Sequence, residues 1–340
     1  MRKYLLLLAT VGLTLFGGQN ALADDMNYSV KADIPENQIG ENLSYFDLKM
    51  APGAEQDITV TVSNRSDKKE TIHLEVNNAM TNRNGVIDYS QHGKKTDESL
   101  KYPVEKLITN NQQKVDFSPG ETKKVSFHLK MPKEKIAGTI LGGIHISKES
   151  EAKKSKKQSV TIENLYSYVL GLQIREDMET VKPVMNLKDV KPTLVNYRTA
   201  VAANLQNSTP TILRKVSVDA KVYKKNSKDV LHTTKKENMN VAPNTNFDFP
   251  INWDNEQLQP GTYTLKMHVD SDSGEWDFTK DFTIEGKEVK KLNDEAVELK
   301  KTDNTLLYIL SGVIIALILA FILFFLYMRR KSKSNEEKDK

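Results

Sequence analysis

The chain has 340 residues, 38% of them hydrophobic, a formal net charge of +4 at pH 7 and no cysteine. The absence of cysteine excludes disulfides, thiol catalysis and cysteine-ligated zinc. The positive excess lies in the first three and the last twelve residues, and the chain between them is close to neutral, which argues against a nucleic-acid-binding surface.

The N-terminus has the layout of an export signal. Arg2 and Lys3 precede an apolar run over residues 4–17, and Ala21-Leu22-Ala23 fits a cleavage site. We therefore expect residues 1–23 to be a signal peptide and the mature chain to begin at Asp24.

Short alternating runs separated by turn residues follow. Residues 57–62 (DITVTV) and 71–76 (TIHLEV) place every second side chain on one face, and Asn84-Gly85 and Pro119-Gly120 mark tight turns. Short strands at this spacing predict an antiparallel β-sandwich.

Two apolar runs, 138–146 and 165–174, flank a lysine-rich segment. We interpret the runs as two central strands of one hairpin, so that the first domain covers residues 24–177. A boundary near residue 155 is the alternative. The loop offers an electrostatic contact to anionic wall polymers, or is simply a solvated hairpin tip; its candidate residues are Lys153, Lys154, Lys156 and Lys157.

About seven further strand patterns lie between residues 185 and 284, separated by turns such as Pro243-Asn244 and Pro260-Gly261. Their number and spacing predict a second immunoglobulin-like domain over residues 178–286. Trp253 follows one of these strands. Partial exposure there would make it a partner-binding anchor, and a core position is the alternative.

The C-terminal part is expected to hold helices. Helical spacing of apolar residues predicts a stalk helix over 287–305, and the uncharged run 306–328 predicts one transmembrane helix. Residues 329–340 are then a cytoplasmic basic tail. The expected localisation is the cell membrane, single-pass, with the N-terminal ectodomain outside and the lipid bilayer as a partner. The predicted fold class is mostly β, with two tandem immunoglobulin-like β-sandwich domains, a short stalk helix and this transmembrane helix.

The common catalytic and nucleotide-binding motifs do not occur in the sequence: it has no nucleophile elbow, H-E-x-x-H, G-x-G-x-x-G or P-loop. We therefore predict a protein that is not an enzyme and that needs no cofactor and no metal. Asp270, Asp272 and Glu275 resemble part of a calcium loop, but a hairpin turn explains the same residues.

A series of stretches in a fixed order extends over nearly the whole mature chain: 45–53 with 58–62, 78–89, 138–146, 168–176, 204–207, 239–253, 258–265 and 274–278. In these stretches and in the order of its parts, the chain resembles the WxL-interacting proteins of Gram-positive bacteria. The resemblance implies an N-terminal domain that associates with peptidoglycan. It also implies a membrane-proximal domain that engages WxL-type surface proteins or host ligands such as extracellular-matrix proteins.

The resemblance carries no binding residues over, so the candidate saccharide contact comes from side-chain chemistry. Asn82, Asn84 and Tyr89 lie around one predicted hairpin, and amide and aromatic groups suit sugars; turn chemistry with one exposed tyrosine is the alternative. We expect a membrane-anchored cell-surface adaptor that associates with peptidoglycan and binds WxL-type surface proteins or host extracellular-matrix ligands. The alternative is an accessory component of a cell-wall-modifying enzyme, or a cryptic enzyme of that kind.

Overall fold

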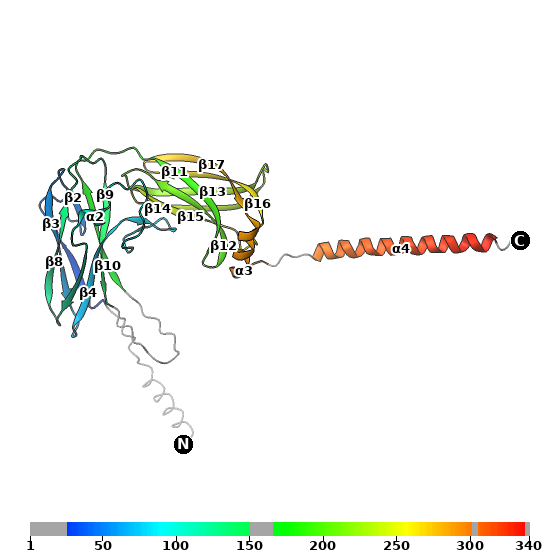
Figure 1. The fold of residues 1–340 in the computed structure, drawn as a ribbon, viewed down its shortest axis with the longest axis horizontal. Helices are drawn as coiled ribbons and strands as arrows, with labels where there is room; N and C mark the ends of the chain where they lie inside the picture. The colour runs from blue at the N-terminus through cyan, green and yellow to red at the C-terminus, as the bar shows by residue number, and fades with distance from the viewer. Residues whose placement is uncertain (1–25, 150–165, 301–304, 337–340) are drawn as a thin grey trace, which may run out of the picture.

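The computed structural model of the chain describes residues 26–149, 166–300 and 305–336, and in the last segment it describes side chains for residues 309–325. The predicted signal peptide, residues 1–23, lies outside the described residues, as do Lys153, Lys154, Lys156 and Lys157. Two β-sandwiches meet at a corner of the molecule (Figure 1).

The first sandwich packs a three-stranded sheet against a five-stranded sheet. In spatial order, the smaller sheet consists of β1 (Tyr28–Asp33), β3 (Glu55–Asn64) and β8 (Thr122–Lys130). The larger sheet consists of β2 (Phe46–Lys49), β10 (Ser167–Arg175), β9 (Ile140–Lys148), β4 (Glu70–Asn78) and β7 (Gln112–Phe117). β2 runs parallel to β10, and the other neighbours are antiparallel. The short helix α2 (Val104–Leu107) precedes β7 in the chain.

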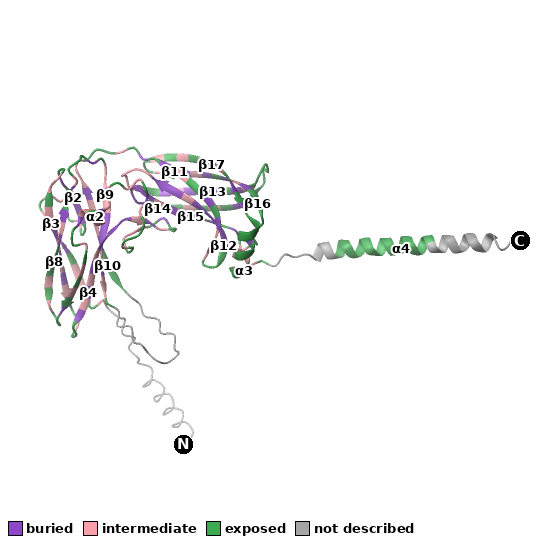
Figure 2. Cartoon of the chain, viewed as in Figure 1, coloured by how far each residue is buried: buried purple, intermediate pink, exposed green. Residues whose placement is uncertain are grey.

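Alternation places the core of this sandwich between its sheets. Ile58, Val60 and Val62 of β3 are each at most 1% exposed, while the residues between them are partly accessible. The two apolar runs predicted to form one hairpin do pair, from Ser167 opposite Ser147 to Ile174 opposite Ile140. Figure 2 shows the buried residues along the strands of both sandwiches.

The second sandwich has sheets of three and four strands, all antiparallel. The three-stranded sheet is β11 (Met185–Val195), β12 (Arg198–Asn207) and β15 (Thr245–Asn252), in spatial order. The four-stranded sheet is β14 (Val230–Val241), β13 (Leu213–Lys224), β16 (Gly261–Ser271) and β17 (Gly274–Ile284). Helix α3 (Gly286–Glu295) follows β17 and packs Val289 into the core of this sandwich.

A small hairpin of the first half of the chain reaches the second sandwich. It consists of β5 (Met80–Thr81) and β6 (Ile87–Asp88). The Oγ1 atoms of Thr81 and Thr245 lie 2.8 Å apart, and the backbone N–H of Asn240 donates to the carbonyl of Gly85 at 2.8 Å. The turn therefore touches both β14 and β15.

A second set of contacts strengthens this junction. The Asp97 carboxylate accepts hydrogen bonds from Gln206 Nε2 at 2.8 Å and from the Asn246 side chain. The backbone N–H of Thr139 donates to the carbonyl of Pro210 at 2.8 Å. Hydrogen bonds from three separate segments thus connect the two sandwiches.

The C-terminal helix α4 (Thr305–Glu336) lies apart from both sandwiches in Figure 1. Among the described residues, no helix combines the length and the apolar character that a membrane crossing requires. This finding contradicts the predicted transmembrane helix 306–328. It also contradicts the predicted single-pass localisation, and it leaves the predicted lipid-bilayer contact without support.

Candidate functional site

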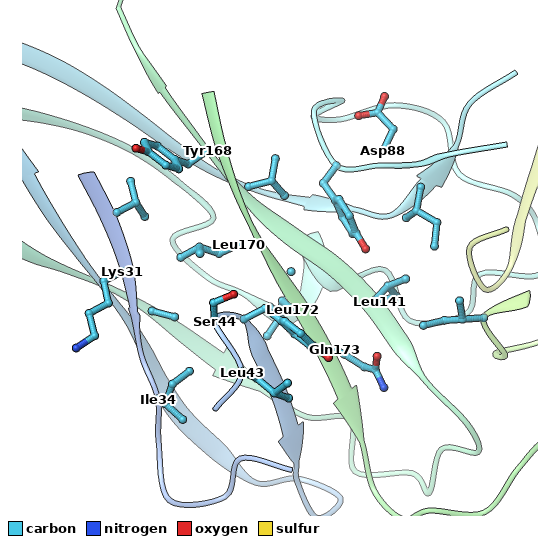
Figure 3. A pocket seen from close by; sticks show the side chains of 18 of the residues that line it. Lys31, Ile34, Leu43, Ser44, Asp88, Leu141, Tyr168, Leu170, Leu172 and Gln173 are labelled. Carbon is cyan, nitrogen blue, oxygen red and sulfur yellow. The ribbon is translucent and has the colours of Figure 1, made fainter. Parts of the chain in front are cut away.

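A groove of about 1110 Å³ runs over one half of β10, from the edge of the first sandwich to the outer face of its larger sheet (Figure 3). β2 pairs with β10 only from Leu172 to Arg175. Among the described strands, none borders residues 167–171 on that side, so the groove forms where the sheet is one strand narrower. Lys31 and Ile34 lie on one side of the groove, and Asp88 and Leu141 on the other.

Two glycines lie on the outer face of the larger sheet at the groove: Gly171 lines it, and Gly143 lies beneath Tyr89, which lines it. Gly143 of β9 and Gly171 of β10 are directly opposite each other. A Cβ atom at Gly143 would lie 2.8 Å from Cδ1 of Tyr89, whereas one at Gly171 would lie 3.7 Å from Cβ of Tyr45. Two tyrosine side chains therefore lie over neighbouring glycines. The contact of Tyr89 with the backbone is possible only because Gly143 has no side chain.

The position of Tyr89 is set by a buried asparagine. Asn77 of β4 is fully buried, and its Nδ2 donates to the carbonyl of Tyr89 at 2.7 Å. The Oδ1 atom of Asn77 lies 2.7 Å from Nδ1 of His92. Asn77 thus attaches the segment from Tyr89 to His92 to the outer face of the sheet.

The charged side chains that line the groove are Lys31, Asp88 and Arg214. Arg214 belongs to β13, so the second sandwich contributes to a groove built mainly by the first. Burial raises the pKa of the Tyr89 hydroxyl, the nearby Arg214 acts to lower it, and Tyr45 acts to raise it. The positive charge of Arg214 therefore acts on the Tyr89 hydroxyl.

The structure separates the three residues predicted to contact a saccharide. Asn82 Oδ1 accepts hydrogen bonds from the backbone N–H groups of Asn84 and Val86, at 2.9 and 3.2 Å, which shapes the turn. Asn84 Oδ1 accepts from Lys236 Nζ of β14 at 3.3 Å, so Asn84 lies at the junction. Tyr89 lines the groove, and Asn82 and Asn84 do not. Saccharide binding by these residues stays a prediction.

Trp253 lies in the core of the second sandwich and is 3% exposed. Its ring is 4.0 Å from that of His232 and meets Tyr263 edge-on at 5.6 Å, measured between ring centroids. His232 Nδ1 lies 2.9 Å from Asp254 Oδ2. These contacts account for a packing role of Trp253, and its proposed role as a partner anchor stays a prediction.

The acidic residues named as a weak calcium alternative lie at the β16–β17 hairpin. Asp270 is opposite Glu275, and the backbone N–H of Asp272 donates to the carbonyl of Arg214 at 3.3 Å. Glu275 instead groups with His268 and Asp277, three exposed residues whose ligand atoms lie within 4.8 Å of one another. The hydrogen bond with Asp277, at 2.8 Å, is the main reason that the pKa of His268 is raised.

Sequence reasoning did not single out Tyr45, Gly171 and Arg214 as site residues, nor Gly143, which lies beneath Tyr89. Gly143 and Gly171 each interrupt an apolar run, which is a usable signal because glycine within a strand indicates close approach of another group. Arg214 has no comparable signal, since its place beside Tyr89 depends on how the two sandwiches meet.

Two family models match the chain. The model described as the WxL Interacting Protein, peptidoglycan binding domain, matches residues 28–148. The model described as the WxL Interacting Protein, host binding domain, matches residues 157–294. A search of curated proteins gave no significant match.

The solved structures that match the chain include fimbrial chaperones. One is the chaperone–tip adhesin complex of CFA/I fimbriae, with 10% identity over 76% of this chain and 98% of that chain and a TM-score of 0.28. Others are the E. coli chaperone DraB (15% identity, 76% and 95% of the chains, TM-score 0.26) and the YadV chaperone (8% identity, 76% and 100%, TM-score 0.28). Scores this low carry no functional argument.

Proposed function

The chain belongs to the WxL Interacting Protein family, with the peptidoglycan binding domain first and the host binding domain second, and from this premise we propose a non-catalytic surface adaptor. In this proposal the first sandwich binds the glycan strands of peptidoglycan in the groove over β10. The second sandwich holds a protein partner, a WxL-type surface protein or a host extracellular-matrix protein.

The groove with its two tyrosines is the observation that carries the peptidoglycan part of the proposal. Tyrosine rings offer an apolar face and a polar tip, and sugar rings have the complementary combination. Tyr45 is 39% exposed, and Gln173 adds an amide within reach of sugar hydroxyls. A volume of about 1110 Å³ accommodates a ligand larger than one sugar ring.

The charges in the groove support binding over turnover. Glycan-cleaving enzymes use a pair of carboxylates, about 5 to 9 Å apart. Among the described residues that line the groove, Asp88 is the only carboxylate, and its Oδ1 accepts from the backbone N–H of Ser90 at 2.8 Å. Lys31 and Arg214 are cations and fit neither role of such a pair.

Binding of the full chain to purified sacculi tests the first part. Tyr89→Ala is expected to weaken binding about tenfold, which is about 1.4 kcal/mol, because it removes the ring above Gly143. Gly143→Ala is expected to act in the same direction by displacing Tyr89, whereas Gly120→Ala, at a glycine outside the groove lining with nothing within 4 Å of an added Cβ, serves as the control. Equal affinities for all four proteins would contradict the glycan site.

Crosslinking on intact cells tests the second part. A protein partner held by the second sandwich is expected to be captured with the full chain and to be lost from the cell surface when the chain is deleted. Capture of a WxL-domain protein would identify the partner class. Unchanged retention of WxL-domain proteins in the deletion strain would count heavily against the adaptor.

A further inference from the structure

Arg214 is exposed at the start of β13, and among the described residues no side chain forms a hydrogen bond or ion pair with its guanidinium group. Two other arginines on strands, Arg175 of β10 and Arg198 of β12, do have partners. Arg175 pairs with Asp47 at 2.5 Å, and Arg198 pairs with Glu298 at 2.5 Å.

The position of Arg214 is nevertheless well defined. Its carbonyl accepts from the backbone N–H of Asp272 at 3.3 Å, and the preceding turn is attached to the first sandwich by the hydrogen bond from Thr139 to Pro210. Ile212 and Arg214 both line the groove, and Arg214 influences the Tyr89 hydroxyl electrostatically. The second sandwich thus presents an unpaired cation beside two tyrosines of the first.

We propose that Arg214 binds a carboxylate of the peptidoglycan stem peptide while the tyrosines contact the adjoining sugar, so that the wall-binding site is complete only when both sandwiches are in contact. This inference rests on the proposed binding of peptidoglycan in the groove. Stem peptides carry free carboxylates close to the sugar ring to which they are attached. An arginine fork matches a carboxylate through two parallel hydrogen bonds.

The groove has the charge that such a ligand requires. Lys31 and Arg214 outnumber Asp88, so the lining carries a positive excess. Lys31 lies at the opposite side of the groove from Asp88 in Figure 3 and would act as a point charge only. Because Arg214 lines the same groove as Tyr89 and its charge acts to lower the pKa of the Tyr89 hydroxyl, it is the cation placed to reach a group attached to a sugar held there.

The test measures binding of the purified full chain to whole sacculi and to sacculi that have been stripped of teichoic acid with hydrofluoric acid. Half of the stripped sacculi are then amidated with carbodiimide and ammonium, which converts carboxylates to neutral amides, and the other half are kept as the untreated sacculi. Three variants are compared with wild type: Arg214→Gln, Arg214→Lys and Lys215→Gln. Lys215 is an exposed neighbour outside the groove lining, so Lys215→Gln removes the same charge from the next position.

Arg214→Gln is expected to bind untreated sacculi about tenfold more weakly than wild type, and Arg214→Lys to fall between them. Lys215→Gln is expected to bind like wild type. Amidation should weaken wild type to the level of Arg214→Gln and leave Arg214→Gln unchanged, a result that a folding defect of the variant cannot produce.

Two outcomes would overturn the inference while leaving the proposed function in place. One is wild-type affinity of Arg214→Gln for untreated sacculi. The other is binding by wild type that is insensitive to amidation but drops on removal of teichoic acid, which would make a phosphate the anion. If wild type binds no form of sacculus, the proposed peptidoglycan function itself fails, and the inference fails with it.

Discussion

The two sandwiches share a two-layer plan but differ on the outer face of the larger sheet. In the first sandwich this face carries the opposed glycines Gly143 and Gly171, with tyrosines above them. In the second it carries charged pairs, such as Lys225 with Asp281. Glycines on adjacent strands let another group approach the sheet closely, whereas exposed ion pairs leave a sheet face solvated.

The cores differ as well. The first core is mostly aliphatic with a few phenylalanines, whereas the second contains an aromatic series in which Trp253 meets Tyr263 and Tyr263 stacks on Phe282 at 5.5 Å. Both tryptophans of the chain, Trp253 and Trp276, lie in the second sandwich. Tryptophan fluorescence therefore reports on one sandwich, and circular dichroism reports on both.

The largest loss of stability is expected from substitutions in the two cores, which test each sandwich separately. Phe127→Ala in the first sandwich and Phe249→Ala in the second each remove a fully buried ring and are expected to cost about 3 to 5 kcal/mol. In urea unfolding, Phe249→Ala should move the fluorescence transition to lower urea concentration by the whole loss of stability. Phe127→Ala should shift the circular dichroism transition more than the fluorescence transition. Equal shifts of both signals by both variants would mean that the sandwiches unfold as one unit.

A substitution at the junction should have the next largest effect. Gly85 has a φ of +67°, and a Cβ there would lie 2.4 Å from Cγ of Met239, which is buried in the second core. Gly85→Ala is expected to cost about 2 to 3 kcal/mol, from the left-handed backbone and from displacement of Met239. Gly93→Ala is the matched control, because Gly93 has a φ of +62° and open space around it. Its cost should be about 1 kcal/mol, and an equal loss for both would show that Met239 moves freely.

Asp97 makes the junction sensitive to acid. Burial acts to raise the pKa of its carboxyl, but hydrogen bonds from Ser99, Asn246 and Gln206 together lower it below 3.8. A lowered folded pKa means that this contribution to stability is complete above the unfolded value of 3.8 and is lost as the pH falls through the folded value.

Asp97→Asn is expected to cost about 1 to 2 kcal/mol at neutral pH, because its amide group faces the donors of Gln206 and Asn246. Thermal unfolding at neutral pH and at about pH 3 measures the effect, and wild type should lose more stability than the variant over that interval. Identical losses would place the acid sensitivity elsewhere.

The smallest effect is expected on the charged face of the second sandwich. Asp277→Asn should leave the melting temperature almost unchanged, because exposed ion pairs contribute little. It should lower the pKa of His268 toward its ordinary value, since the hydrogen bond that His268 donates to Asp277 is the main cause of the raised value. An NMR titration of His268 checks this, and a pKa that does not move would assign the shift to Glu275 or Asp270.

Much of the strand content could be predicted from periodicity. Residues 57–62 and 71–76 alternate in sequence and alternate in burial, because each strand has one face on a core. Pairing between distant segments was not predictable in this way. The parallel contact of β2 with β10 joins residues more than one hundred positions apart, and no local pattern of Phe46–Lys49 specifies it.

The same limit applies to the groove. Tyr89 was selected from the sequence for its chemistry, and it does line the groove. Asn82 and Asn84 were selected with it because all three lie in one hairpin, but the turn directs the asparagines to the junction. Arg214 reaches the groove through the contact between sandwiches, which depends on the surfaces of two complete folds.

The place of β10 in its sheet has a mechanical consequence. β10 is the last strand of the first sandwich along the chain, and near Arg175 it is held by β2 on one side and β9 on the other. Tension that pulls the two sandwiches apart would be transmitted along β10 and would load both rows of hydrogen bonds in shear at the same time. A strand at a sheet margin would instead be peeled away one bond after another. The segment that joins the two sandwiches therefore begins at a strand that has hydrogen-bonded neighbours on both sides.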